Sequence, residues 1–288
     1  MNKNLMKSKK IKSVIFYYSQ LVTGNTKKIA ERIRIGLEIN GNKCDLVKLT
    51  KFQKDLELIQ SFPFEKYDLI GIGVPIYYFH PPYHVLFELE HFPKLNNKKG
   101  FLFCTSGGNP GSTLYQMKEA LTHTNIKIID GCDQWIGCDV HQMYSRQSNS
   151  NGHYGCLPSS EGHPNQRELK DAEKFGRMLI KKAFDPDVEE KTDFWSNDNP
   201  SAIMWSWKGI QSWFPEFNLI KEKCTQCGIC SQICPWDAIM LDPYPTWIKD
   251  CDRCYICDLK CPENAIKCDF SKQIDYLEGL MKKRRDIN

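Results

Sequence analysis

Eight cysteines near the C-terminus form two runs with the same spacing. The first run contains Cys224, Cys227, Cys230 and Cys234, and the second contains Cys251, Cys254, Cys257 and Cys261. The second run repeats the first at an offset of 27 residues, and a proline follows the last cysteine of each run. A loop with this spacing supplies three thiolates to a four-iron, four-sulfur cubane, and its fourth cysteine binds the neighbouring cubane. The pattern therefore predicts two [4Fe–4S] clusters.

The crossed arrangement divides the eight cysteines into two ligand sets. We expect one cluster on Cys224, Cys227, Cys230 and Cys261, and the other on Cys251, Cys254, Cys257 and Cys234. Two other uses of these cysteines stay open, namely a pair of zinc sites or a disulfide framework. Zinc sites usually separate two Cys-x-x-Cys pairs by a longer spacer. Over about residues 218–270 the chain resembles the two-cluster ferredoxins.

Length, composition and charge limit the function further. The chain has 288 residues, which is enough for two domains, and it contains 14 cysteines. Iron–sulfur ligands together with additional unpaired thiols indicate a reducing compartment, most simply an anaerobic cytoplasm. A net charge of +4 is too small to indicate a nucleic-acid partner. We expect no signal peptide and no transmembrane segment, since no apolar run approaches the ~20 residues that a bilayer requires.

Short apolar runs alternate with amphipathic ones over the first 184 residues. Strands are predicted at Ser13–Tyr18, Lys43–Lys48, Tyr67–Val74, Gly100–Thr105 and Ile126–Ile136. Helices are predicted at about Asn25–Asn40, Pro82–Phe92, Ser112–Thr122 and Gln166–Phe184. Nearly continuous apolar strands that alternate with helices indicate an α/β fold, with a doubly wound parallel sheet covered on both faces. Five such strands suit the flavodoxin-like order 2-1-3-4-5.

The rest of the chain divides into a linker and a small domain. We expect a first domain over residues 1–184, a linker over 185–217 and a small α+β domain with a basic tail over 218–288. Within the linker, Ile203, Trp207, Ile210 and Phe214 share one face of an expected interdomain helix. The alternative uses of this helix are to dock a partner or to lie on a membrane surface. Basic residues near both chain ends are either solvated tails or a docking surface for an acidic redox partner.

The loop after the first strand has the composition of an anion site. Ser19, Thr23, Gly24, Asn25 and Thr26 lead directly into the first predicted helix. Backbone N–H groups at a helix N-terminus bind phosphate, and a glycine there allows close approach of the backbone. The Walker pattern of nucleotide-binding loops is absent from the sequence. We therefore expect a phosphate-binding loop of a different kind.

At these residues the N-terminal part resembles the flavodoxin family, and the whole chain resembles the flavodoxin–ferredoxin fusion proteins of anaerobes. The resemblance implies that Ser19, Thr23, Gly24, Asn25 and Thr26 hold the phosphate of FMN. Two extra residues between Ser19 and Thr23 depart from the family pattern. The resemblance also implies that two loops clasp the flavin ring, each at the end of a predicted strand. One contains Pro75, Ile76, Tyr77, Tyr78 and Phe79, and the other contains Thr105, Ser106, Gly107, Gly108 and Asn109.

Two further patterns are weaker. Gly71-Ile72-Gly73 starts like a dinucleotide fingerprint, but it lies inside a predicted strand and lacks the third glycine. His80 and His84 have the spacing of metal ligands on a helix, without the accompanying glutamate of a metalloprotease. We expect these two histidines to lie at the surface or at the flavin rim.

Three functions remain open. In the first, the chain is an electron-transfer protein that connects an external carrier, two clusters, FMN and an unidentified redox partner. In the second, it is an oxidoreductase that reduces its own small substrate at the flavin. The polar residues 139–163 favour this alternative, since His141, Tyr144 and Arg146 are suited to orient a substrate. In the third, it is a redox sensor. The oligomeric state is left open.

Overall fold

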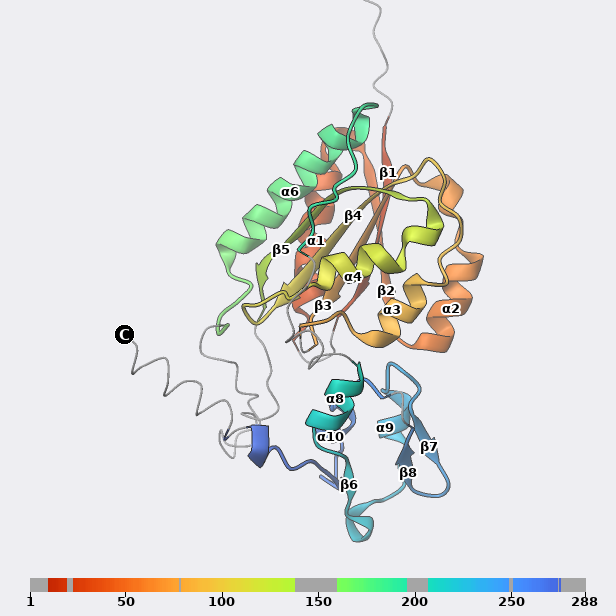
Figure 1. Ribbon diagram of the computed structural model, residues 1–288, viewed down its shortest axis with the longest axis vertical. Coiled ribbons are helices and arrows are strands. Elements are labelled where there is room, and N and C mark those ends of the chain that lie inside the picture. The colour runs from red at the N-terminus through yellow and green to blue at the C-terminus, as the bar shows by residue number, and fades with distance from the viewer. Residues whose placement is uncertain are drawn as a thin grey trace, which may run out of the picture. The chain divides into compact units, whose positions relative to one another are not determined.

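The computed structural model describes residues 10–19, 23–77, 79–137, 160–195, 207–248, 251–273 and 275 (Figure 1). The described residues fall into two compact units, which are presented in turn. The first unit holds most of the described residues up to Trp195, and the second holds those from Trp207 onward. No helix in these described ranges is long and apolar enough to cross a membrane.

A five-stranded parallel sheet forms the centre of the first unit. Its strands are β1 (Lys12–Tyr18), β2 (Lys43–Leu49), β3 (Leu69–Pro75), β4 (Lys99–Ser106) and β5 (Lys127–Ile136). They are arranged in the order β2-β1-β3-β4-β5, and every neighbouring pair is parallel. The predicted strands and their order are thus confirmed. Because all strands run the same way, their carboxyl ends meet at one edge, which is where ligands bind in such sheets.

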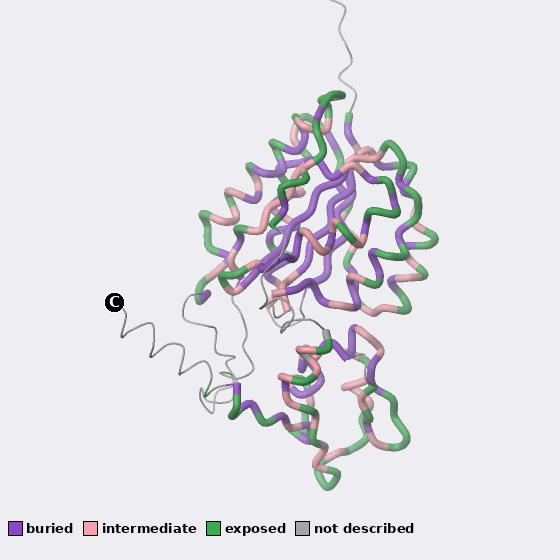
Figure 2. Tube along the Cα trace, in the orientation of Figure 1, coloured by how far each residue is buried: buried purple, intermediate pink, exposed green. Residues whose placement is uncertain are grey.

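Helices cover both faces of this sheet. They are α1 (Asn25–Leu37), α2 (Phe52–Ser61), α3 (Tyr83–Leu89), α4 (Thr113–Ala120) and α6 (Gln166–Phe184), with short 3-10 turns at Ile39–Gly41, Phe64–Lys66 and Thr122–Thr124. Successive residues of β1 face opposite sides: Phe16 joins the core under α2, α3 and α4, and Ile15 joins the core under α1 and α6. Figure 2 shows the buried strands between these two layers.

Three predicted helices are shorter in the structure, since α3 and α4 also end before Phe92 and Thr122, and one helix was not predicted. Helix α1 ends at Leu37 rather than Asn40, because Asn40 has a left-handed φ of 58°. Helix α2 was not predicted from the sequence. Among its apolar side chains only Ile59 is buried, so its apolar stripe is too narrow to give a periodic signal.

Helices α1 and α6 cross with their backbones in close contact at two glycines. A Cβ on Gly36 would lie 2.1 Å from the Glu173 carbonyl oxygen, and one on Gly176 would lie 2.3 Å from the Ile33 carbonyl oxygen. Since neither position has room for a side chain, the two helices are locked together. This contact fixes helix α1, whose first residues belong to the expected phosphate loop.

The second unit is small and built from short elements. They are α8 (Trp207–Trp213), β6 (Asn218–Leu219), a 3-10 turn (Lys221–Lys223), α9 (Ile229–Gln232), β7 (Ile239–Leu241), β8 (Pro245–Trp247), α10 (Ile256–Leu259) and β9 (Ile266–Lys267). Strand β6 pairs antiparallel with β9, and β7 pairs antiparallel with β8. The expected tryptophan-rich helix includes α8, while Ile203 lies outside the described residues.

Candidate functional site

The expected phosphate loop ends at the N-terminus of α1. Gly24 caps this helix with a left-handed φ of 64°, a conformation that glycine adopts without steric cost. Among the described residues, no heavy atom lies within 4 Å of the position that its Cβ would take, so its backbone borders space that these residues leave open. The Ser19 hydroxyl accepts a hydrogen bond of 3.3 Å from the Lys27 backbone N–H in the first helical turn. Ser19 therefore lies at the helix N-terminus despite the two extra residues before Thr23.

Side chains of this loop contact the ends of β4 and β5. The Thr26 and Thr105 hydroxyls are 2.9 Å apart and hydrogen-bonded. Asn25 packs on Gly137, where an added Cβ would lie 2.6 Å from the Asn25 amide nitrogen. The Gly137 backbone N–H donates to the Ser106 carbonyl oxygen at 2.9 Å. The expected phosphate loop and the loop after β4 are thus brought together at the carboxyl edge of the sheet.

The two expected ring loops also touch each other. Tyr77 and His80 exchange backbone hydrogen bonds of 2.8 and 3.0 Å in a tight turn, which gives Phe79 a left-handed φ of 69°. A Cβ on Gly111 would lie 2.3 Å from the Phe79 carbonyl oxygen, so the loop after β4 packs directly against this turn. Gly108 has a φ of 133° and faces open space. Tyr78 lies outside the described residues.

The two histidines after β3 are buried, so the surface alternative of their expected placement is wrong, while the flavin-rim alternative stays a prediction. His80 accepts a hydrogen bond of 2.6 Å at Nδ1 from the amide of Gln116 on α4. His84 is fully buried, and its ring meets the ring of Tyr18 edge-on at a centroid distance of 4.5 Å. His84 lies on the buried side of α3, whereas His80 precedes this helix and is held by its hydrogen bond to α4. No three His, Cys, Asp or Glu side chains in the described ranges are grouped as one metal ion would require.

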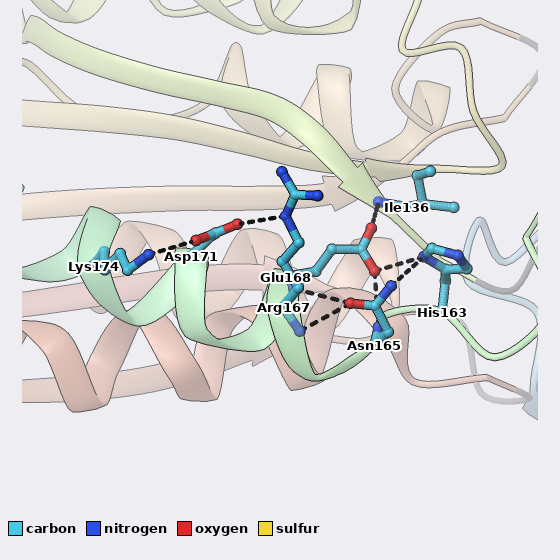
Figure 3. Close-up of polar contacts among 7 residues, drawn as sticks. All are labelled: Ile136, His163, Asn165, Arg167, Glu168, Asp171 and Lys174. Atoms are coloured by element: carbon cyan, nitrogen blue, oxygen red, sulfur yellow. Dashed lines mark hydrogen bonds and ion pairs between the residues drawn. The ribbon is translucent and has the colours of Figure 1, made fainter.

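A carboxylate on α6 holds the residues on either side of the polar 139–163 stretch (Figure 3). Glu168 accepts hydrogen bonds from the Ile136 N–H at 2.8 Å and from the Asn165 N–H at 2.8 Å. His163 Nδ1 lies 2.6 Å from the same carboxylate. Sequence analysis did not identify this clamp, although Asn165 and Glu168 have the spacing of a capping box. The expected substrate residues His141, Tyr144 and Arg146 lie outside the described residues.

In the second unit, four cysteines line one pocket. They are Cys224, Cys227, Cys230 and Cys261, which is the first ligand set expected from the spacing. Leu219, Ile229 and Ile266 form part of the apolar wall of this pocket. Thiolates around an apolar cavity are the donor set that an iron–sulfur cubane requires, so the residues fit the group.

Three of the other four cysteines are buried. Cys234, Cys251 and Cys257 pack into one apolar cluster with Ala238, Ile239 and Ile266. Burial raises the pKa of the Cys251 thiol to about 12, and burial together with the neighbouring cysteines Cys251, Cys234 and Cys257 raises the pKa of Cys254. The four thiols of the second expected set are therefore neighbours.

The two cysteine loops have matching backbones. Left-handed residues recur at the 27-residue offset in three pairs, which are Gln226 and Arg253, Gly228 and Tyr255, and Asp237 and Asn264. Short helices follow at equivalent places, α9 after the first loop and α10 after the second. The Ala238 N–H donates to Cys234 Sγ at 3.3 Å, and the Ala265 N–H donates to Cys261 Sγ at 3.3 Å. The sequence repeat is therefore also a structural repeat.

One residue beside the second cysteine set was missed by sequence analysis. Trp247, at the end of β8, packs against the apolar cluster that contains Cys257. Its indole nitrogen is buried and finds no hydrogen-bond acceptor among the described protein atoms. Burial raises the pKa of the Cys257 thiol, and the nearby Trp247 donor lowers it. A buried donor beside several cysteines, with no acceptor of its own, fits a site that is completed by a sulfur-rich group.

Comparison with known proteins assigns both units. A family model for a flavodoxin domain matches residues 14–130, and a model for a 4Fe-4S binding domain matches residues 217–240. The comparison with curated proteins gave no significant match.

Several solved structures resemble the first unit at low identity. A flavodoxin from the domain Archaea shares 16% identity, with coverage of 60% of this chain and 99% of that chain, at a TM-score of 0.37. Flavodoxin 2 from Bacillus cereus shares 16% identity, with coverage of 59% and 99%, at a TM-score of 0.41. The rubredoxin oxygen:oxidoreductase from Desulfovibrio gigas shares 14% identity, with coverage of 60% and 36%, at a TM-score of 0.38. Similarities of this size do not bear on function.

The matched ranges coincide with the sites described above. Residues 14–130 include the open glycine at the start of α1, and the flavodoxin model implies FMN. Residues 217–240 include the first cysteine run, and that model implies a 4Fe–4S cluster. The chain thus joins a flavodoxin domain to a 4Fe–4S binding domain, as in the flavodoxin–ferredoxin fusion proteins, and is a flavin and iron–sulfur electron-transfer protein.

Proposed function

We propose that this protein transfers electrons one at a time between an external low-potential carrier, two [4Fe–4S] clusters, one FMN and a redox partner protein. Iron–sulfur cubanes carry single electrons, and flavin accepts one or two, so the combination connects one-electron carriers with two-electron chemistry. The observation that carries the proposal is the structural repeat of the two cysteine loops. Every recognisable site in the chain is a redox site, and the modest net charge of +4 suits a protein partner rather than nucleic acid.

Two clusters, rather than one, are supported by the matched backbones of the loops. Cys224, Cys227, Cys230 and Cys261 hold the first cluster, and Cys251, Cys254, Cys257 and Cys234 hold the second. The left-handed residues of the first loop recur in the second, including Tyr255 at a place where the first loop has a glycine. A positive φ is uncommon for a residue other than glycine, yet the second loop keeps it with a tyrosine. This supports the same ligand geometry in both loops.

For the flavin, the open glycines at the carboxyl edge of the sheet support FMN. The backbone at Thr23–Thr26 and the Ser19 hydroxyl hold the phosphate at the N-terminus of α1, where the helix dipole favours an anion. The loops at residues 75–79 and 105–109 hold the ring. Gly108 borders open space there and brings backbone N–H groups close to the ring edge. We divide the chain accordingly into an FMN domain (1–184), a linker (185–217) and a cluster domain (218–288).

The proposal is tested first by composition and then by electron flow. Protein purified without oxygen is expected to contain about one FMN and about eight iron atoms per chain. Dithionite reduction of the clusters, followed by rapid mixing, is then expected to lead to reduction of the flavin. A flavin that stays oxidised while both clusters are reduced would contradict the electron-transfer proposal. Iron without flavin would instead mean that the first domain serves as a docking scaffold.

The Glu168 clamp favours a second candidate function. It fixes Ile136 and His163, on either side of residues 138–159, beside the expected flavin loops. An oxidoreductase that binds a small substrate over its flavin requires polar residues held in this place. Replacing residues 141–158 with a short glycine linker tests this candidate. Unchanged flavin reoxidation by small acceptors, with the linker in place, argues for electron transfer alone.

A further inference from the structure

The two halves of the repeat differ in the side chain that the neighbouring strand places beside each cysteine set. Strand β6 pairs Leu219 with Ile266, and strand β8 pairs Trp247 with Ile239. Ile239 and Ile266 are equivalent residues of the repeat, so Trp247 occupies the place that Leu219 has in the first half. Leu219 lines the pocket of the first cysteine set. Trp247 packs against the apolar cluster that holds Cys234, Cys251 and Cys257 of the second set, and Leu219 also borders this cluster. The second loop therefore has an indole N–H where the first has a methyl group.

The Trp247 ring is held in one orientation. It stacks on Phe217 at a centroid distance of 4.6 Å, with an angle of 7° between the planes. Phe217 is held in turn by Tyr255 and by the guanidinium of Arg253, which lies 5.5 Å from its ring centroid. The Tyr255 hydroxyl donates to the Pro215 carbonyl oxygen at 2.8 Å. Because this stack is pinned at several points, the indole N–H has little freedom to turn toward another acceptor.

We infer that the Trp247 indole N–H donates a hydrogen bond to a sulfur of the second cluster and raises the reduction potential of that cluster. This inference rests on the proposed two-cluster function. Its basis is a buried donor that has no acceptor in the described protein and packs against the apolar cluster that holds three of the expected sulfur ligands. Reduction adds one electron to the cluster and moves no proton, so the indole keeps its hydrogen. A donor to sulfur stabilises the more negative, reduced cluster and thereby raises the potential.

This donor offsets an opposing effect of burial. Cys234, Cys251 and Cys257 of the second set are buried, whereas Cys227 of the first set is exposed. Added negative charge is less well stabilised in a buried site, so burial alone lowers the potential of the second cluster. The indole therefore brings the potentials of the two clusters closer together, which favours exchange of an electron between them.

The test uses the full chain with both cofactors and two substitutions of the tryptophan. Trp247→Phe keeps the aromatic stack and removes the N–H, and Trp247→Leu gives the second loop the residue of the first. In a dithionite titration followed by electron paramagnetic resonance, we expect one cluster midpoint to fall and the other to stay. At a fixed ambient potential, the ratio of reduced to oxidised second cluster should fall by about five- to tenfold, where tenfold equals about 59 mV. Trp236→Phe, in the same apolar cluster, is the matched control and should leave both midpoints in place.

A second measurement uses the unaltered protein, so the inference can be tested even if a Trp247 variant loses iron. Tryptophan labelled with ¹⁵N at the indole should give a nitrogen hyperfine coupling to the reduced second cluster, and its exchangeable proton should disappear in deuterium oxide. Full iron content with unchanged midpoints in both Trp247 variants, or no such coupling, would overturn the inference. Iron content far below about eight in the unaltered protein would instead refute the two-cluster proposal itself.

Discussion

Gly228 and Tyr255 occupy equivalent positions in the two cysteine loops, and both have a left-handed backbone, with φ of 75° and 54°. Glycine adopts this conformation freely, whereas a residue with a Cβ loses roughly 1 kcal/mol. Tyr255 is nevertheless almost fully buried, in ring contact with Phe217 and Phe270. The second loop therefore combines a locally unfavourable backbone with favourable packing of a large side chain.

Replacing Tyr255 by glycine should destabilise the cluster domain. The change relieves roughly 1 kcal/mol of backbone strain, but truncation of a buried aromatic side chain costs about 3–5 kcal/mol. We expect a lower Tm and faster loss of the visible cluster absorbance on heating. Gly228→Ala is the control and should cost only about 1 kcal/mol, since the nearest atom to its Cβ is Leu241 Cδ1 at 3.6 Å. A Tyr255→Gly protein more stable than the original would mean that strain outweighs packing.

Gly24→Ala should weaken FMN binding without unfolding the domain. An added methyl group meets no atom of the described residues within 4 Å, yet it would occupy the space through which a phosphate reaches the helix N-terminus. We expect the Kd for FMN, measured by quenching of flavin fluorescence, to rise by roughly tenfold or more.

Gly41→Ala is the matched control for this substitution. Gly41 has a similar left-handed φ of 78°, and the nearest atom to its Cβ is the flexible end of Lys10. Both substitutions should lower stability by roughly 1 kcal/mol through backbone strain. An equal loss of FMN affinity in both proteins would show that Gly24 does not face the phosphate.

Glu168→Gln should lower the stability of the flavodoxin domain more than Asp171→Asn, which removes a charge about one turn later on the same helix. Glu168 receives backbone N–H groups on both carboxylate oxygens, and an amide NH₂ would face one of these donors instead. The expected loss is about 1–3 kcal/mol. Asp171→Asn removes only exposed ion pairs with Arg167 and Lys174, and should change stability by about 0.5 kcal/mol or less (Figure 3). Thermal melts of the two variants make the comparison, and equal Tm values would contradict the clamp.

Cys132 should react slowly with alkylating reagents, with a shifted pH dependence. Burial on β5 raises the pKa of this thiol from 9.0 to about 11. Because the thiolate is the nucleophile, alkylation by iodoacetamide at pH 8 should be about a hundredfold slower than for an unperturbed thiol. The rate should keep rising up to about pH 11. The raised pKa also means that this thiol contributes stability below pH 9 and loses it as pH rises through 11. Mass spectrometry of the Cys132 peptide provides the rate, and a plateau near pH 9 would contradict the burial.

Much of the fold was predictable from local patterns. The five strands are nearly continuous apolar runs, and alternate residues such as Ile15 and Phe16 serve the two faces, so strand positions and order followed directly. Helix α2 did not, since Ile59 is its only buried apolar side chain and gives no periodicity. His80 and His84 were misplaced because burial of α3 depends on its packing against α4, which sequence spacing does not encode.

The candidate sites show the same division between local and tertiary information. The cysteine spacing predicted the two ligand sets, and the structure places the first set around one pocket. Trp247 was missed because alignment by cysteines pairs it with Ile220, whereas strand pairing makes it equivalent to Leu219. The segment between the strand residue and the first cysteine of the loop is one residue shorter in the second half than in the first. Only the sheet registers, which join residues far apart in sequence, reveal that shift.

The Glu168 clamp joins two segments that are far apart in the sequence. Ile136 and His163 are bound by one carboxylate, so the end of β5 and the residues before α6 are held at the same point. Loop closure becomes only slightly less favourable as a loop lengthens, so such a junction tolerates large changes in the length of an inserted segment. An engineer can use the same junction to graft a peptide or a small binding domain beside the carboxyl edge.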